Sequence, residues 1–350
     1  MISLNIQPVA ICAGKTVIYW SGLIIALGTL SGFLLSNAIY TAHHRNRAAM
    51  WVMLPFSVVF SIVLCRMLHW YCHTEQYASF FSAVTDYSSG GYCIQGILPG
   101  VWFGALMSKG FGFTDRTEKL LDAAAPGLAL TIAFIRLSSL FNDSCRSKYS
   151  IEKTALKKLP FGAPLSSSAQ DWRFATFFVE FMFMMLAMVL LFFAFYHMHN
   201  SRMKRPCHRS GHIFRLFLLL FSMAELVLDS TRNDSSFMRF PGTLKLLNKF
   251  AGFVSVAQLV AAITMLAVML YYSKRSIKAN GHKKYHILLW LGYFVSLALV
   301  GGSEYAVQRW SNYHNVLYIP MTLGAITMAA VIFAMYFTCV EQKMRFEDDY

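Results

Sequence analysis

Nine long apolar segments, separated by short polar ones, constrain the fold of this chain more than any other feature. Most contain about the 20 residues that an α-helix needs to cross the hydrocarbon core of a bilayer. A spanning backbone must satisfy its own hydrogen bonds, so each segment predicts a helix. We therefore expect an all-α polytopic integral membrane helix bundle with about nine transmembrane helices. The predicted spans are residues 16–40, 48–71, 92–108, 118–141, 173–197, 213–231, 246–272, 285–308 and 315–340.

Composition agrees with this membrane prediction. Of the 350 residues, 56% are hydrophobic and only 14% are charged, which is more apolar surface than a soluble domain of this size can bury. The first 15 residues lack the charged and short apolar regions of a cleavable signal peptide, so we expect the first span to remain as an anchor.

The basic residues gather in alternate connections between the predicted spans. They are Arg45, Arg47, Lys109, Arg116, Lys119, Arg202, Lys204, Arg205, Arg209, Arg215, Lys274, Arg275, Lys278, Lys283 and Lys284. The positive-inside rule places such connections in the cytoplasm, so we expect the N-terminus outside and the C-terminal tail inside. Residues 72–91 contain no Lys or Arg, as an outer loop should. The net charge of +14 is thus explained by membrane orientation, and we expect no nucleic-acid partner.

One connection departs from this pattern. Residues 142–172 are basic yet fall outside the membrane on this count of spans. A basic outer segment can attract anionic lipid headgroups, or it can be merely a solvated loop. The sequence leaves both interpretations open.

No motif in the chain indicates a metal or a cofactor, and we expect neither. There is no P-loop, no dinucleotide-binding fingerprint and no nucleophile elbow. His69 and His73 are four positions apart, but two histidines alone do not complete a zinc ligand set. Cys72 and Cys93 flank the outer loop and could form a disulfide, a matter of geometry that sequence does not decide.

Arg136 is the most informative residue for function, because it lies at or just inside the end of a predicted span. An unneutralised guanidinium in hydrocarbon costs at least about 2.5–3.5 kcal/mol, so such an arginine is a functional candidate by default. Its fork of donors suits a lipid phosphate. The alternative is a structural ion pair with an acidic residue of another span, for which the candidates are Glu180, Glu225 and Asp229.

These acidic residues have alternatives of their own. Glu180 lies eight residues into an apolar run, where an ion pair is a plainer role than catalysis. Glu225 and Asp229 are one helical turn apart and share a face. Such a pair can supply a catalytic base, or its charge can be neutralised by Arg136 or Arg232. Glu304 stands near a predicted helix end beside Arg309, a possible partner, and we assign it no role.

The order of several motifs resembles that of the prolipoprotein diacylglyceryl transferase family. The similar segments are VIYWSGLIIALGTLSGFLLS (17–36), CRMLHWY (65–71), the pair Gly90 and Gly91 followed by Gly96, IRLSSLFND (135–143), and the later helices 177–193 and 213–232. The resemblance covers about residues 16–272. It implies a seven-helix core over residues 1–272 and two additional C-terminal helices with a cytoplasmic tail over residues 273–350.

The resemblance also implies an activity. Members of the family transfer a diacylglyceryl group from phosphatidylglycerol to the lipobox cysteine of a prolipoprotein signal peptide, in the bilayer of the bacterial cell membrane. The implied catalytic residues are Arg136, Gln95 and Asp229. The implied substrate-binding residues are Arg66, Asn142, Arg232, Ser139, Gly90, Gly91 and Gly96. For Arg66 the alternative is snorkelling of its side chain to the membrane interface.

The chain departs from the family pattern at several of these positions. Gln95 stands where the family has a histidine, and an amide cannot take up a proton near neutral pH. Ser139 and Ser144 replace the family's asparagine and acidic residue, and Glu225 replaces an arginine. The alternative function is therefore a catalytically inactive member of the family that binds or transports lipid or serves as an accessory protein.

Overall fold

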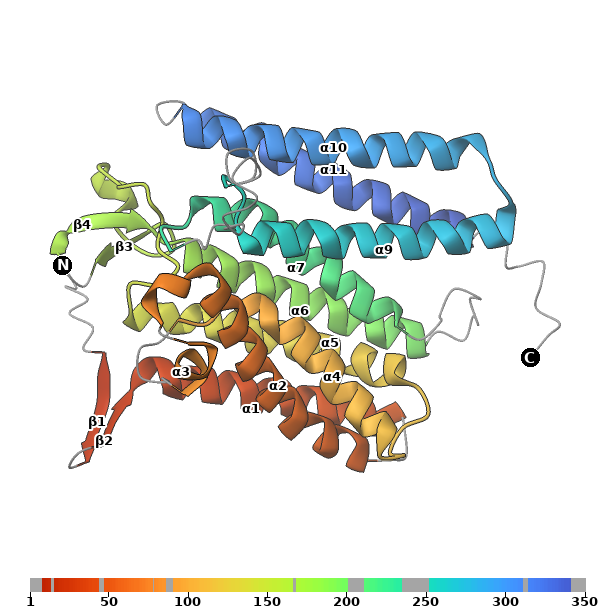
Figure 1. The fold of residues 1–350 in the computed structure, drawn as a ribbon, viewed down its shortest axis with the longest axis horizontal. Coiled ribbons are helices and arrows are strands. Elements are labelled where there is room, and N and C mark those ends of the chain that lie inside the picture. The colour runs from red at the N-terminus through yellow and green to blue at the C-terminus, as the bar shows by residue number, and fades with distance from the viewer. Residues whose placement is uncertain are drawn as a thin grey trace.

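The computed structural model describes residues 8–13, 16–43, 47–77, 79–85, 91–165, 168–200, 211–234, 252–310 and 314–340. In these ranges the chain is mainly helical, and the long helices run roughly side by side between the two ends of the bundle (Figure 1). Successive long helices alternate in direction, as short connections require.

Each predicted span has a helix. The long helices are α1 (Trp20–His43), α2 (Ala48–Cys72), α4 (Ile97–Gly110), α5 (Thr117–Ser138), α6 (Thr176–Asn200), α7 (His212–Thr231), α9 (Val256–Asn280), α10 (Lys284–Arg309) and α11 (His314–Val340). The short helical pieces are Thr74–Gln76, α3 (Phe80–Thr85), Ile94–Gly96, Ser139–Phe141 and Thr154–Leu156. The expectation of a polytopic helix bundle is confirmed, since seven helices of the described part are long and apolar enough to cross a membrane.

The count of about nine spans is not confirmed, for two physical reasons. Helix α4 has 14 residues, which is about 21 Å of helix and shorter than the hydrocarbon core. Helix α7 carries Arg215, Glu225 and Asp229, so every stretch of 18 residues within it contains three charged side chains. Both helices pack against helices of the seven candidate spans.

Helix α5 lies at the centre of the bundle, and close backbone contacts fix it there. It is largely buried and packs against α1, α6 and α7. Gly32 of α1 faces Gly127 of α5, and a Cβ atom on either would meet the other's carbonyl oxygen. Helix α4 approaches α2 in the same way, because a Cβ atom on Gly100 would lie 2.6 Å from the Ser61 nitrogen. Small residues at such crossings let helices pack closely inside a membrane.

Helices α10 and α11 pack against each other, and α11 also packs against α7 and α9 (Figure 1). A second apolar cluster, rich in methionine, fills this interface; it includes Met265, Met269, Met321 and Met328. Helix α9 begins with a capping box, in which Ser255 and Gln258 bond each other's backbone N–H groups.

Two antiparallel hairpins lie at one end of the bundle (Figure 1). Strands β1 (Val9–Ala13) and β2 (Thr16–Tyr19) form the first. Strands β3 (Gly162–Leu165) and β4 (Ser168–Phe174) form the second, inside the basic segment 142–172. The C-terminal ends of α5 and α7 and the N-terminal end of α6 meet at the same end, and these ends carry the charged residues of the site.

Candidate functional site

Arg136 lies between two buried carboxylates near the C-terminal end of α5. Its Nε is 2.7 Å from Oε2 of Glu180, in the second turn of α6. Its Nη2 donates to Oε1 of Glu225 on α7 at 2.5 Å. All three side chains are about 4% exposed. The ion pair weighed as an alternative for Arg136 is thus present, and three helices supply it.

Gln95 extends this cluster toward the start of α4. Its Nε2 donates to Oε2 of Glu225 at 2.9 Å, so each oxygen of that carboxylate has one donor. The Oε1 atom of Gln95 accepts from the thiol of Cys93 at 2.8 Å. Gln95 therefore lies within one hydrogen bond of Glu225.

Asp229 and Arg232 form a second ion pair at the C-terminal end of α7. The Arg232 Nη1 atom is 3.4 Å from Oδ1 of Asp229. Its Nε and Nη2 donate to the two oxygens of Asp234 at 3.0 and 3.2 Å. Burial by itself would raise the pKa of the Asp234 carboxyl, but the Arg232 guanidinium and the Cys145 N–H more than offset this and lower it below 3.8.

Cys145 joins the two ion-paired groups. Its thiol accepts from Nη1 of Arg136 at 3.2 Å, and its backbone N–H donates to Oδ2 of Asp234 at 3.0 Å. The residue has a φ of 55°, a left-handed conformation that side chains rarely adopt. Burial raises the pKa of the thiol despite the nearby guanidiniums of Arg232 and Arg136, so Cys145 is protonated at neutral pH.

The cluster as a whole has more acidic than basic groups. Two guanidiniums, those of Arg136 and Arg232, face four carboxylates. The carboxylates are those of Glu180, Glu225, Asp229 and Asp234. The two guanidiniums are thus each shared between two carboxylates.

Arg66 lies apart from this cluster, on α2. It is 1% exposed, so its side chain does not snorkel to an interface. Its Nε donates to the Ala83 carbonyl at 2.5 Å and its Nη1 to the Gly91 carbonyl at 2.7 Å. Its guanidinium also lies 5.1 Å from the centroid of the Tyr77 ring. Arg66 thus ties together both sides of the loop that precedes α4.

The glycines of the predicted site have backbone roles in the described chain. Gly91 has a φ of 78°, which favours glycine, and a Cβ atom there would meet the His69 ring. Gly96 packs against the α2 backbone beside Cys65. Gly90 lies outside the described residues. No disulfide joins Cys72 to Cys93, both of which the structure describes.

Asn142 and Ser139 lie just beyond Arg136, at the end of α5. Asn142 is exposed, and its Oδ1 accepts from the Ser144 backbone N–H at 3.0 Å. Ser139 is buried, and its hydroxyl accepts from the Ser144 hydroxyl at 3.0 Å. These side chains order the turn that leads to Cys145.

Comparison with known proteins identifies the family. A model of prolipoprotein diacylglyceryl transferase matches residues 8–274. This chain belongs to that family. The resemblance noted in the sequence is confirmed over nearly the same range, and the match contains every residue of the charged cluster. Helices α10 and α11 follow the matched part.

Similar proteins bear a matching name. The phosphatidylglycerol–prolipoprotein diacylglyceryl transferase of Trichormus variabilis is 25% identical over 272 residues, covering 77% of this chain and 92% of the relative. The protein of that name from Clostridium botulinum (strain Hall) is 23% identical over 274 residues, covering 76% and 96%. The one from Gloeobacter violaceus is 25% identical over 230 residues, covering 65% and 82%.

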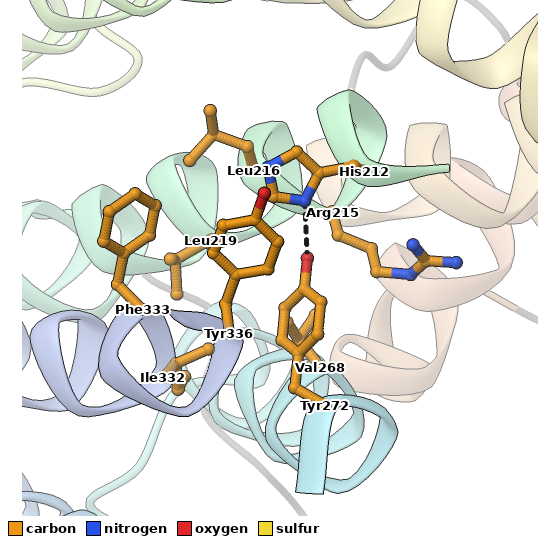
Figure 2. Close-up of a pocket in the computed structure, with 9 residues that line it drawn as sticks. All are labelled: His212, Arg215, Leu216, Leu219, Val268, Tyr272, Ile332, Phe333 and Tyr336. Atoms are coloured by element: carbon orange, nitrogen blue, oxygen red, sulfur yellow. Dashed lines mark hydrogen bonds between the residues drawn. The ribbon is translucent and has the colours of Figure 1, made fainter. Parts of the chain in front are cut away.

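A small cavity lies at the other end of α7, where the family-matched helices α7 and α9 meet α11 (Figure 2). His212 Nδ1 and the Tyr272 hydroxyl are 3.0 Å apart there, and the His212 ring stacks on Tyr336 with centroids 4.2 Å apart. The cavity measures about 10 Å³, room for one water molecule. The lining residue of α7 nearest to the charged cluster, Leu219, is six positions or about 9 Å of helix from Glu225, and no residue of the cluster lines the cavity.

Several residues of the site were not predicted from the sequence. Cys145 and Cys93 lie in the stretch around Arg136 and Gln95, but neither has a metal or redox spacing. Asp234 follows Arg232 by two positions, a charge alternation that could have signalled it. Arg309 was one possible partner for Glu304, to which we assigned no role from the sequence. Instead its two oxygens accept from Gln258 at 3.0 Å and Gln308 at 2.7 Å.

Proposed function

We propose that this protein transfers a diacylglyceryl group from phosphatidylglycerol to the cysteine thiol of a prolipoprotein. The observation that carries the proposal is the family match over residues 8–274, which encloses a buried cluster of guanidiniums and carboxylates at one end of the bundle. The names of the relatives specify both substrates.

The reaction defines what the site must supply. The substrate sulfur forms a bond to the carbon of the diacylated glycerol that carries the phosphate. The bond between that carbon and the phosphate oxygen breaks. Glycerol phosphate leaves, and the thiol proton passes to a base. Positive charge must therefore meet the departing phosphate, and a proton acceptor must face the thiol.

We infer that Glu225 is the proton acceptor, since Gln95 cannot be. Glu225 is held by Gln95 and Arg136 through different oxygens, so its position is fixed from two sides. Protonation of Glu225 would remove its charge and weaken its hold on Arg136. The guanidinium would then be released to the phosphate at the step when negative charge develops there.

The remaining predicted residues support this arrangement. Asp229 holds Arg232, the second guanidinium of the cluster, 3.4 Å away. Asn142 and Ser139 lie on the outer side of Arg136, where a lipid headgroup would approach. Arg66 and Gly91 fix the loop that ends in Gln95 and thus act on the site through Gln95.

We infer that the protein is a multi-pass protein of a bacterial cell membrane, with the charged cluster toward the outer side. The basic residues at helix ends support this orientation: Arg47, Lys109, Lys119, Arg215, Lys278 and Lys284. These residues lie at the end of the bundle opposite the hairpins, because successive helices alternate in direction (Figure 1). The positive-inside rule places that end in the cytoplasm and the N-terminus outside.

Complementation tests the activity. The full chain is expressed in a bacterial strain depleted of its own diacylglyceryl transferase, and the mass of a reporter lipoprotein is measured. We expect a diacylglyceryl adduct on the reporter cysteine. Absence of the adduct, with the protein present in the membrane, would contradict the proposal and favour an inactive lipid-binding member of the family.

A matched pair of variants tests the site. Arg136→Lys keeps the charge but loses the second nitrogen that bridges two carboxylates, so we expect turnover to be abolished. Arg215→Lys makes the same change at the other end of the bundle, where Arg215 lies over the Tyr271 ring, and should retain activity. Full turnover by Arg136→Lys would overturn the assignment of Arg136.

A further inference from the structure

We propose that Tyr318 of α11 and Glu304 of α10 are positioning residues, through which the two helices beyond the family match hold the charged cluster in place. This inference rests on the proposed function for its kinetic consequence. Its structural basis is independent. Tyr318 bonds to the α7 backbone at Ser230, and Glu304 bonds to Gln258, which in turn bonds to the α7 backbone at Leu226.

The segment after α5 is paired with the segment after α7. The Lys148 N–H and the Ser147 hydroxyl both donate to the Thr231 carbonyl at 3.0 Å, and the Asn233 N–H donates to the Arg146 carbonyl at 2.8 Å. One of the paired segments carries Cys145 at its start. The other runs from residue 229 to 234 and carries both ion-pair partners of Arg232.

Tyr318 bonds to both paired segments with one hydroxyl. The hydroxyl donates to the Ser230 carbonyl at 3.1 Å and lies 3.3 Å from the Tyr149 hydroxyl. Ser230 is the neighbour of Asp229, and Tyr149 lies four positions after Cys145. The Tyr318 and Tyr149 rings also meet edge to face, with centroids 6.1 Å apart. Helix α11 therefore bonds to both of the paired segments that carry residues of the charged cluster and Cys145.

Glu304 supports α7 from a second side. It is 3% exposed and accepts from Gln258 Nε2 at 3.0 Å. The same Nε2 donates to the carbonyl of Leu226, the neighbour of Glu225, at 3.3 Å. A carboxylate buried on α10 thus fixes the amide that contacts the α7 backbone beside Glu225. Placing an acidic group inside a bilayer is costly, so one found there indicates a function.

The two contacts flank the acidic pair of α7. Glu304 acts next to Glu225 through Gln258, and Tyr318 acts next to Asp229 through Ser230. Catalytic groups depend on neighbours that lock their positions, and small displacements lower turnover more than they alter binding. Helices α10 and α11 would therefore affect catalysis without touching a substrate.

Tyr318→Phe tests the proposal, with Tyr293→Phe as the matched control. Tyr293 is a fully buried tyrosine of α10 whose hydroxyl donates to the Ala262 carbonyl of α9 at 3.4 Å, a contact that involves neither paired segment. Both variants lose one hydroxyl and keep the ring. We expect Tyr318→Phe to lower kcat about 5- to 10-fold with little change in KM, and Tyr293→Phe to leave both near wild type.

Labelling of Cys145 by N-ethylmaleimide gives a readout that does not need activity. The full chain in detergent is treated with the reagent, and the tryptic peptide of residues 137–146 is quantified by mass spectrometry. Cys145 is buried and protonated, so wild type should label slowly. Loss of the Tyr318 hydroxyl should loosen the paired segments and raise the labelling rate about 5- to 10-fold, whereas Tyr293→Phe should not.

The outcomes separate the two proposals. If wild type forms no product but Tyr318→Phe still speeds labelling, the proposed function fails and the positioning contact stands. If Tyr318→Phe matches wild type in labelling and in turnover, the positioning role is overturned. Should Tyr318→Phe fail to fold, Tyr149→Phe removes the other half of the same contact from a half-buried loop residue. Unchanged labelling in that variant would also overturn the proposal.

Discussion

Buried acidic groups lie at both ends of α7, but their partners differ. At the start of the helix, Asp122 of α5 accepts the backbone N–H groups of Gly211 at 2.5 Å and Phe214 at 2.8 Å. Near its end, Glu225 and Asp229 bond to side chains, those of Arg136, Gln95 and Arg232. The first arrangement caps a helix, and the second links charged side chains from several elements.

The difference separates a structural acid from functional ones. Backbone N–H groups at a helix start cannot move away without unfolding the helix. Asp122 therefore keeps these two hydrogen-bond donors for as long as α7 is folded. A guanidinium on a long side chain can exchange one anionic partner for another. The end of α7 that carries Glu225 can therefore respond to a substrate, whereas the end capped by Asp122 holds the bundle together.

The largest effect is expected from breaking the cluster. Arg136→Gln leaves Glu180 and Glu225 buried without their cation, which should lower the free energy of unfolding by about 3–5 kcal/mol and abolish turnover. Thermal unfolding in detergent measures the loss. Adding Glu180→Gln and Glu225→Gln to Arg136→Gln should recover much of the stability but none of the activity. A stable single variant would show that the carboxylates are neutral in the folded protein.

Glu225→Gln alone should separate catalysis from stability. Glutamine keeps an oxygen for Arg136 and about the same size, so the bundle should fold, but it cannot accept the thiol proton. We expect turnover to fall by at least about 100-fold, the usual contribution of a general base. Turnover is measured with phosphatidylglycerol and a lipobox peptide. Wild-type turnover would exclude Glu225 as the base and direct attention to Glu180.

Asp122→Asn should show the opposite behaviour. Its side chain keeps one acceptor oxygen and loses its charge at the α7 start, so we expect a loss of about 1–2 kcal/mol in the free energy of unfolding. Turnover per folded molecule should stay near wild type. Asp115→Asn, in the exposed connection before α5, is the control and should change neither quantity. A selective loss of turnover in Asp122→Asn would contradict the purely structural role that we assign to Asp122.

The smallest effect concerns pH. Arg232 holds the pKa of the Asp234 carboxyl below its ordinary value, so ionised Asp234 favours the folded state. This contribution is complete above about pH 5 and is lost as the pH falls through the folded-state pKa. Unfolding midpoints measured from pH 7 to pH 3 should decline less for Asp234→Asn than for wild type. Equal slopes would contradict the Asp234–Arg232 contact.

The sequence predicts the positions of the long helices better than it predicts how many of them cross the membrane. Each predicted span has a helix, but α4 and α7 are not among the seven helices of the described residues that are long and apolar enough to cross a membrane. The 92–108 segment loses its first five residues to a loop and a short 3-10 turn, leaving a helix of 14 residues. The acidic residues of α7, Glu225 and Asp229, are buried against neighbouring elements.

The sequence by itself determined the helices, the family and the position of the intramembrane charges, because apolar runs and motif order are local properties of a chain. Only the tertiary structure decided which charges meet. Arg136 and Glu225 are 89 positions apart, and Gln95 and Glu225 are 130 apart. The sequence offered both Arg136 and Arg232 as partners for Glu225 and Asp229. Helix packing pairs Glu225 with Arg136 and Asp229 with Arg232. The bond between Tyr318 and Ser230 was unforeseeable for the same reason, since a tyrosine near a membrane helix end is commonplace.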